Sequence, residues 1–210
     1  MRDRNAPLTL ADVAGLDWSK MDGLVPAVVQ DGATLQLLML GYMNEEALRQ
    51  TLESGLATFY SRSKGRLWTK GETSGNHLKV RGVFADCDND ALLVRAEPVG
   101  PTCHLGTASC FDAEEADGVG WLARLARIVA ERAEAPPAES YTARLLAEGP
   151  QRIAQKVGEE GVELALAGAA GERQQCIEEA ADLIYHLTVL MQAMGFDWDD
   201  IAAVLKDRHK

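Results

Sequence analysis

The segment HLKVRGVFADCDNDALLVRAEPVG, residues 77–100, decides the fold of the first half of this 210-residue chain. Two apolar runs flank an aspartate-rich turn, and this pattern predicts a β-hairpin that reverses at residues 89–90. Working outward, apolar runs on either side of residues 31–32 and of residues 63–65 predict two further hairpins. This half of the chain is therefore expected to be β-rich.

One helix is expected inside the β-rich half, over residues 44–55. Asn44 is a good N-cap, the two glutamates after it suit a first turn, and Gly55 suits the end. From about Gly120 onward the apolar residues recur with the period of a helix. The expected helices lie within residues 121–135, 140–149, 150–171, 173–195 and 198–210.

The change of pattern predicts two domains, residues 1–115 and 116–210, with a polar, glycine-containing boundary near residues 114–120. We expect a β-rich (α+β) domain followed by an all-α helical bundle. One apolar stripe in the second domain is expected to be core. It consists of Ile177, Ala180, Ala181, Ile184, Leu187, Leu190, Met191 and Met194.

The composition excludes several classes of protein. The net charge is −11 and no basic stripe is present, so nucleic-acid binding is not expected. No apolar run is long enough to span a membrane, and the first residues lack the apolar core of a signal peptide. We therefore expect a cytoplasmic protein, whose four cysteines are free thiols or metal ligands rather than disulfides.

The aspartate-rich turn has the composition of a metal site. On a strand, side chains alternate faces, so Asp86, Asp88 and Asp90 are expected to point one way and Cys87 the other. Three carboxylates on one face repel each other unless a cation binds among them, and oxygen ligands suit Mg²⁺ or Ca²⁺. An EF-hand is rejected because the sixth position of the loop is Ala91 rather than glycine, and because the flanks look like strands.

Three cysteines lie within 24 residues: Cys87, Cys103 and Cys110. Thiolates are soft ligands that suit Zn²⁺, and three of them would leave the fourth position open, as in a catalytic site. The alternative takes His104 as a fourth ligand and makes the zinc structural. The spacing leaves both interpretations open.

Four motifs in this half resemble phosphoribosyl-AMP cyclohydrolase of histidine biosynthesis. They are GYMNEEAL (41–48), TFYSRSKGRLWTKGETSGNHL (58–78), DCDNDALLV (86–94) and PTCHLGTASCF (101–111), and the resemblance covers about residues 22–113. It implies a homodimer in which Asp86, Asp88 and Asp90 hold Mg²⁺. It also implies that Cys103 and Cys110 hold Zn²⁺ together with Cys87 of the partner subunit.

The resemblance further implies that zinc-activated water opens the N1–C6 bond of the purine ring of phosphoribosyl-AMP. His104 is the candidate base, with a structural histidine as the alternative. The segment KGETSGNH could donate backbone N–H groups to a phosphate, although SGN is also an ordinary turn. The resemblance makes these residues substrate-contact candidates: Trp68, Lys70, Glu72, Ser74, Gly75 and Asn76. Arg62 is a further candidate for meeting phosphate charge.

The helical half carries a second group of acids. Glu159, Glu160 and Glu163 share a helix face by spacing, as do Glu179 and Asp182. Acids at the edge of an apolar face need a partner or a metal. Either a metal site or an ion-pair network with Lys156 and His186 satisfies them.

The runs SYTARLL, IAQKVGEEGVEL and EEAADLIYHLTVLM resemble phosphoribosyl-ATP pyrophosphohydrolase, a member of the all-α, MazG-like pyrophosphohydrolases, over about residues 121–210. The resemblance implies that Glu159, Glu160, Glu163 and Asp182, with Glu179 beside them, bind Mg²⁺ for the triphosphate. Lys156 is a candidate for phosphate charge, and Glu160 is our candidate for orienting the water. A general nucleotide pyrophosphohydrolase is the alternative.

Together the two resemblances imply a bifunctional enzyme. Its substrates would be phosphoribosyl-ATP and phosphoribosyl-AMP, in the second and third steps of histidine biosynthesis. The other class of protein considered is a metal-binding module whose zinc is structural and whose helices only dimerise. Residues 1–20 receive no role.

Overall fold

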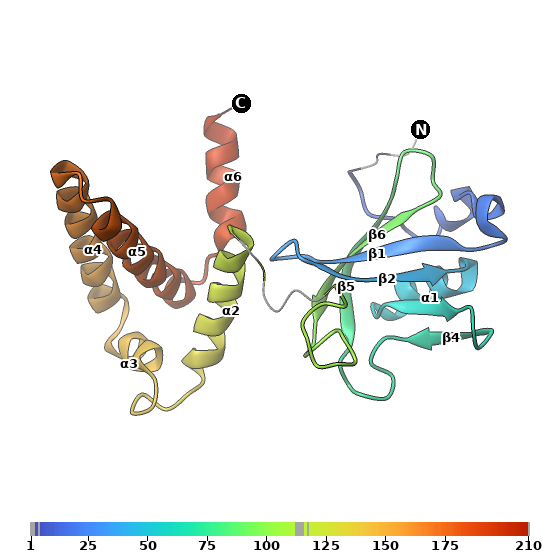
Figure 1. The fold of residues 1–210 in the computed structure, drawn as a ribbon, viewed down its shortest axis with the longest axis horizontal. Coiled ribbons are helices and arrows are strands. Elements are labelled where there is room, and N and C mark those ends of the chain that lie inside the picture. Colours follow the sequence, from blue (N-terminus) through green and yellow to red (C-terminus); the bar gives the residue numbers. More distant parts are fainter. Residues whose placement is uncertain (1–2, 4, 112–115, 117, 210) are drawn as a thin grey trace. The chain divides into compact units, whose positions relative to one another are not determined.

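A computed structural model of the chain describes residues 3, 5–111, 116 and 118–209. The chain divides into two compact units, Met1–Trp121 and Leu122–Lys210, and each is described by itself (Figure 1). Within the described ranges, no helix has both the length and the apolar character that crossing a membrane requires. The strand-rich unit precedes the helical one, which confirms the expected fold class.

A four-stranded sheet forms the centre of the first unit (Figure 1). Its strands are β1 (Val25–Asp31), β2 (Leu37–Met43), β5 (Leu78–Ala85) and β6 (Leu92–Pro98), in the order β2-β1-β6-β5. The pairs β1–β2 and β5–β6 are antiparallel, and β1 and β6 are parallel. This confirms two of the predicted hairpins, which pair with each other through β1 and β6.

The third predicted hairpin forms a separate two-stranded sheet, β3 (Thr58–Ser61) and β4 (Arg66–Thr69). Helix α1 (Glu45–Ser54) precedes it and begins and ends as its sequence predicts. The Asn44 side chain accepts a hydrogen bond from the Ala47 N–H at 2.8 Å, and Gly55 ends the helix with a φ of 71°. Leu48 of this helix and Phe59 of β3 are fully buried in the core beside the sheet.

The strand prediction is wrong at the aspartate-rich turn. Strand β5 ends at Ala85 and β6 begins at Leu92, so residues 86–91 form a loop, which we term the acid loop. Asn89 has a φ of 62°, a left-handed conformation that asparagine tolerates better than most residues. The alternation of side chains along a strand therefore does not govern where the three aspartates point.

The N-terminal segment, to which the sequence assigned no role, packs into the first unit. It contains two 3₁₀ helices, η1 (Val13–Gly15) and η2 (Trp18–Met21). The side chains of Leu8, Val13 and Leu16 are buried in the core of the sheet domain.

The second unit consists of helices (Figure 1). They are α2 (Gly120–Ala133), α3 (Tyr141–Glu148), α4 (Pro150–Ala170), α5 (Arg173–Met194) and α6 (Trp198–Arg208). Each corresponds to one predicted segment. Helices α4 and α5 lie side by side as a long hairpin. The core of the second unit contains Leu125, Val129, Leu145, Ile153 and Val189, contributed by α2, α3, α4 and α5.

The expectation that the whole stripe on α5 is core is wrong at both ends, Ile177 and Met194, and at Ala181 in its middle, all of which are exposed. Ile177 is 47% exposed and Met194 is 59% exposed, whereas Met191 is buried. On α4, Val162 and Leu166 are also exposed, at 60% and 65%. A two-helix hairpin within one chain covers only part of its surface, so an apolar face remains on α4 and α5.

Candidate active sites

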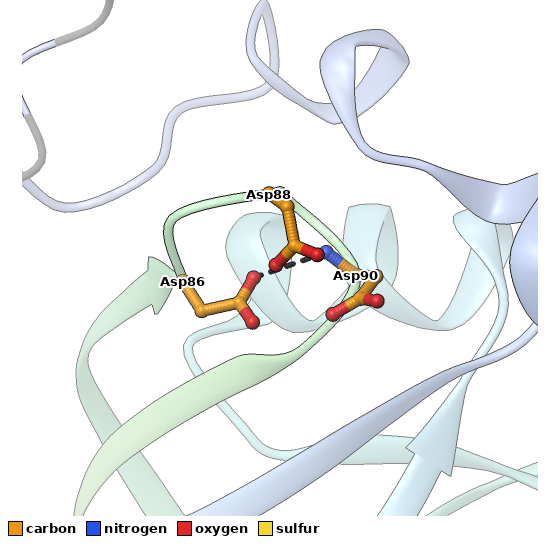
Figure 2. A group of neighbouring side chains, drawn as sticks. All are labelled: Asp86, Asp88 and Asp90. Atoms are coloured by element: carbon orange, nitrogen blue, oxygen red, sulfur yellow. Dashed lines mark hydrogen bonds between the residues drawn. The ribbon is translucent and has the colours of Figure 1, made fainter.

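The acid loop brings its three predicted ligands together (Figure 2). Carboxylate oxygens of Asp86, Asp88 and Asp90 lie within 4.8 Å of one another. One oxygen of Asp86, Oδ1, accepts hydrogen bonds from the N–H groups of Asp90 and Ala91, at 3.0 and 3.2 Å. The loop folds around this aspartate, and the turn rather than strand alternation gathers the acids.

A lysine that sequence reasoning missed contacts this cluster. Lys20 Nζ lies 2.6 Å from Asp88 Oδ2 and 2.7 Å from Asp90 Oδ2. Its ammonium group holds the pKa of Asp88 below the usual range. The contact joins residues that are about seventy positions apart, and no local sequence signal predicts it.

Most of the predicted substrate contacts line one cavity of about 510 Å³ in the first unit. Trp68, Lys70, Glu72, Ser74 and Asn76 line it, together with Cys103, His104 and Cys110. Gly75 belongs to the same loop but does not line the cavity. Arg62 lies elsewhere, with its guanidinium 3.9 Å from the centre of the Tyr42 ring.

The two cysteines in the cavity differ in their acidity. The pKa of Cys103 is lowered, first by the backbone N–H of Leu105 and then by the hydroxyl of Thr107. The pKa of Cys110 is raised by burial and by the charge on Cys103. Cys103 is therefore the first of the pair to become a thiolate, which is the form that binds soft metals.

The third cysteine lies apart from this pair. Cys87 is exposed on the acid loop, with its Sγ 3.9 Å from Asp88 Oδ1. Among the described residues, the groups of three or more potential ligands within 4.8 Å do not include it. His104 is exposed, and its Nδ1 lies 3.8 Å from Cys103 Sγ. One chain thus presents two cysteines and one histidine at the cavity.

The loop of residues 69–77 shapes one wall of the cavity. Gly71 has a φ of 84°, and a Cβ there would lie 2.5 Å from the backbone carbonyl of Asn76. Glu72 accepts a hydrogen bond from the Thr69 N–H at 3.1 Å and pairs with Arg66 at 3.0 Å. The Arg66 charge lowers the pKa of Glu72, which keeps this carboxylate ionised. The loop is therefore held by its own contacts.

In the second unit, α4 and α5 bring three predicted acids together. Ligand oxygens of Glu160, Glu179 and Asp182 lie within 4.8 Å of one another. The pKa of Glu163 is raised, first by the charge on Glu179, so Glu163 belongs to the same negative region. Glu159 instead pairs with Lys156 at 2.8 Å, and this lowers its pKa. Glu159 thus shares a face with these acids but has a cationic partner on its own helix, Lys156, three positions before it.

Glu160 is buried, at 6% exposure, and has two nitrogen neighbours. Lys156 Nζ lies 3.0 Å from its Oε1, and His186 Nδ1 lies 3.5 Å from the same atom. Part of the predicted ion-pair network is therefore present beside the potential metal ligands. These contacts involve Glu160, so the arrangement combines an ion pair with a group of acids that could hold a metal.

The orientation of His186 follows from its partners. Its Nδ1 lies 3.0 Å from the Asp182 carbonyl, which only accepts, so Nδ1 carries the hydrogen. In the neutral ring, Nε2 then accepts from the Tyr141 hydroxyl at 3.3 Å. Sequence reasoning missed Tyr141, although it lies in the SYTARLL motif. Its partner is 45 positions away, so only the fold shows the contact.

Comparison with known proteins gives matches to both halves. Residues 39–112 match the family of phosphoribosyl-AMP cyclohydrolase, and residues 122–209 match that of phosphoribosyl-ATP pyrophosphohydrolase. Relatives named histidine biosynthesis bifunctional protein HisIE align along almost the whole chain. The protein of Vibrio cholerae is 56% identical over 197 residues, which are 93% of this chain and 94% of the relative.

Two other relatives carry the same name. The Escherichia coli protein is 56% identical over 195 residues, covering 93% of this chain and 96% of its own. The Yersinia pestis protein is 51% identical over 203 residues, covering 97% and 99%. Both matches span the sheet unit and the helical unit.

Proposed function

This chain belongs to the HisIE family of bifunctional histidine-biosynthesis enzymes, and we propose that each of its two units carries one of the two activities. The enzyme is a phosphoribosyl-AMP cyclohydrolase and a phosphoribosyl-ATP pyrophosphohydrolase. The cyclohydrolase would occupy residues 1–115 and the pyrophosphohydrolase residues 116–210. The pyrophosphohydrolase would act first, as the second step of the pathway, and the cyclohydrolase would act next, as the third step. The order of the two steps is thus opposite to the order of the domains along the chain.

The helical unit would hydrolyse phosphoribosyl-ATP to phosphoribosyl-AMP and pyrophosphate. Glu160, Glu179 and Asp182, whose ligand oxygens lie within 4.8 Å of one another, would hold Mg²⁺ together with Glu163. The chemistry of Mg²⁺ there is to neutralise the triphosphate. The pKa of Glu163, raised first by the charge on Glu179 and also by that on Glu160, supports a cation among these acids. Glu160 would orient the attacking water, because Lys156 and His186 hold its carboxylate in place.

Lys156 and Glu159 have a different role in this proposal. Lys156 pairs with both Glu159 and Glu160, so its charge lies at the edge of the acid cluster. A phosphate entering the cluster would meet that ammonium group. Glu159 would set the position of Lys156 and would bind the metal only if Lys156 moved to the phosphate.

The sheet unit would open the N1–C6 bond of phosphoribosyl-AMP in the cavity lined by Trp68, Lys70 and Asn76. Cys103 and Cys110 would hold Zn²⁺, whose chemistry is to activate water for attack near neutral pH. The lowered pKa of Cys103 supports a thiolate ligand there. His104, exposed at the cavity, would accept the proton from the water. The acid loop would hold Mg²⁺ through its carboxylates.

The observation that carries the proposed zinc site is the separation of the cysteines. Two line the cavity, and the third lies on the acid loop outside their group. A homodimer in which Cys87 of the partner subunit completes the zinc ligands would reconcile this geometry with three ligands. The exposed apolar residues of α4 and α5 provide a surface on which two copies could associate.

Complementation between two inactive variants tests this arrangement. Cys87→Ser and Cys103→Ser each remove one ligand, so each alone should lose zinc and ring opening while releasing pyrophosphate normally. In a mixed dimer, one of the two sites would regain all its ligands. Co-expression should therefore restore up to about a quarter of the wild-type cyclohydrolase activity, given random pairing of two subunits.

Zinc content, measured by mass spectrometry of the metal, should rise in parallel with the restored activity. A mixture of Cys103→Ser with Cys110→Ser serves as the control, because both ligands come from the same side of the site. That mixture should stay inactive. Restoration in the control, or no restoration with Cys87→Ser, would contradict a zinc site shared between subunits.

A further inference from the structure

The first twenty residues contribute a cation to the acid loop, and the proposed function gives this cation no task. Lys20 lies at the third position of η2 and contacts the carboxylates of Asp88 and Asp90 at 2.6 and 2.7 Å. These are short charge-assisted contacts, and both are made by one ammonium group. Lys20 thus bridges the two aspartates in the same way as a small cation would.

The backbone presents Lys20 to the loop. The Asp17 side chain caps η2 by accepting a hydrogen bond from the Ser19 N–H at 3.2 Å. The Asp17 N–H in turn donates to the carbonyl of Asn89, within the acid loop, at 2.8 Å. The cap residue of η2 is therefore tied to the acid loop close to the ion pairs, and Lys20 does not extend from a free chain end.

Lys20 and a divalent cation require the same oxygens. Asp86 Oδ1 already accepts two backbone hydrogen bonds, so a cation in the loop would depend on the carboxylates of Asp88 and Asp90, each of which offers an Oδ2 atom. Lys20 contacts these two atoms. An ammonium group and Mg²⁺ a few ångströms apart repel each other strongly, so both cannot remain in close contact with the same carboxylates.

We propose that Lys20 is a built-in counter-cation of the acid loop, which holds the carboxylates together without metal and is displaced when a divalent cation binds. Lys20 thereby weakens the affinity of the loop for the cation while keeping the loop folded without it. The inference rests on the proposed placement of Mg²⁺ at Asp86, Asp88 and Asp90. Lys20 is thus not a metal ligand, yet it sets how tightly the acid loop holds the metal.

The test measures cation binding directly, with Mn²⁺ as the probe and the electron-paramagnetic-resonance signal of free Mn²⁺ as the readout. All proteins are full-length and carry Glu179→Gln and Asp182→Asn, which remove binding at the helical acids. Lys20→Met and Lys20→Gln are compared with Lys20→Arg, which keeps the charge. Lys79→Met is the matched control, because Lys79 is exposed at the end of β5 opposite the acid loop.

Lys20→Met and Lys20→Gln should bind Mn²⁺ about three- to tenfold more tightly than the parent at low salt, since two exposed ion pairs are removed. Added KCl should narrow this difference because it screens the competing charge. Lys20→Arg and Lys79→Met should bind like the parent. Without metal, hydrogen exchange at the amides of Asp90 and Ala91 should be faster in Lys20→Met, and saturating Mn²⁺ should remove the difference.

Unchanged or weaker binding in both neutral Lys20 variants, with normal binding in the parent, would overturn the inference and leave the proposed metal site intact. Binding that does not depend on Asp86, tested by Asp86→Asn in the parent, would overturn the metal site and the inference together. Tighter binding in Lys79→Met equal to that in Lys20→Met would also overturn it, because general charge would then be the cause.

Discussion

At the scale of single residues, neighbouring acids on one helix have opposite environments. Lys156 lies beside Glu159 and lowers its pKa, whereas the charge on Glu179 raises the pKa of Glu163. Glu163 therefore weakens the folded state when it ionises, unless a cation binds. The spacing of the acids in the sequence predicts that they share a face, but it does not distinguish the paired acid from the repelled ones.

Glu163→Gln should raise the thermal stability of the metal-free enzyme at neutral pH. The folded-state pKa of Glu163 lies above its unfolded value of 4.5, so the destabilisation appears as pH rises through the folded pKa. The gain over wild type should therefore shrink as pH falls toward 4.5, where the carboxyl is protonated in both states. Calorimetry of wild type, Glu163→Gln and the exposed control Glu178→Gln checks this. A gain that grows at low pH would be the wrong sign.

Tyr141→Phe should slow pyrophosphate release. The lost hydroxyl donates to His186, which in turn neighbours Glu160, so the carboxylate that would orient water loses part of its support. A hydrogen bond of about 1 kcal/mol corresponds to a loss of roughly five- to tenfold in kcat. Tyr185→Phe is the matched control, since its hydroxyl contacts Thr142 instead. Equal losses in both variants would indicate a general packing effect.

At the scale of elements, the loop of residues 69–77 combines a left-handed backbone conformation at a glycine with close packing. Gly71 has a positive φ and has no room for a Cβ beside Asn76. Strand β4 and the loop after it thereby position Trp68, Lys70 and Asn76 along one wall of the cavity. The cavity depends on a glycine that makes no proposed contact with the substrate.

Gly71→Ala should impair the cyclohydrolase and spare the pyrophosphohydrolase. A side chain in the left-handed region costs about 1–2 kcal/mol, before any clash is counted. The loop should shift and the KM for phosphoribosyl-AMP should rise. Gly15→Ala is the matched control, because a Cβ there meets nothing within 4 Å. Steady-state kinetics on both substrates measures the effect, and a normal KM in Gly71→Ala would contradict this role of the loop.

The elements also show what a sequence can predict. The three hairpins, α1 with its caps, and the later helices all follow from local patterns, and the structure confirms them. The sequence pattern places the acid loop on a strand because its alternating Asp residues imitate strand periodicity. The sequence does not predict the ion pairs of Lys20, because its partners are distant in sequence. The exposure of Ile177 and Met194 was missed because periodicity identifies an apolar face but not what covers it.

At the scale of the whole molecule, the uncovered apolar face of α4 and α5 predicts self-association. Leu166→Glu places a charge on this face, where Val162 and Leu166 lie one turn apart. The variant should be monomeric by light scattering, and its pyrophosphohydrolase activity should fall if the site requires the dimer. Val119→Glu, at an 85% exposed position in the first unit, is the control. A Leu166→Glu protein that stays dimeric would remove this face from the interface.

The most direct test of the central claim, one activity in each unit, is mass spectrometry of phosphoribosyl-ATP incubated with Mg²⁺, Zn²⁺ and each of three proteins. Wild type should release pyrophosphate and then add one water. Cys103→Ser should stop at phosphoribosyl-AMP. Asp182→Asn should leave phosphoribosyl-ATP unchanged, yet open the ring of added phosphoribosyl-AMP. Ring opening by folded Cys103→Ser, or pyrophosphate release by Asp182→Asn at the wild-type rate, would contradict the account.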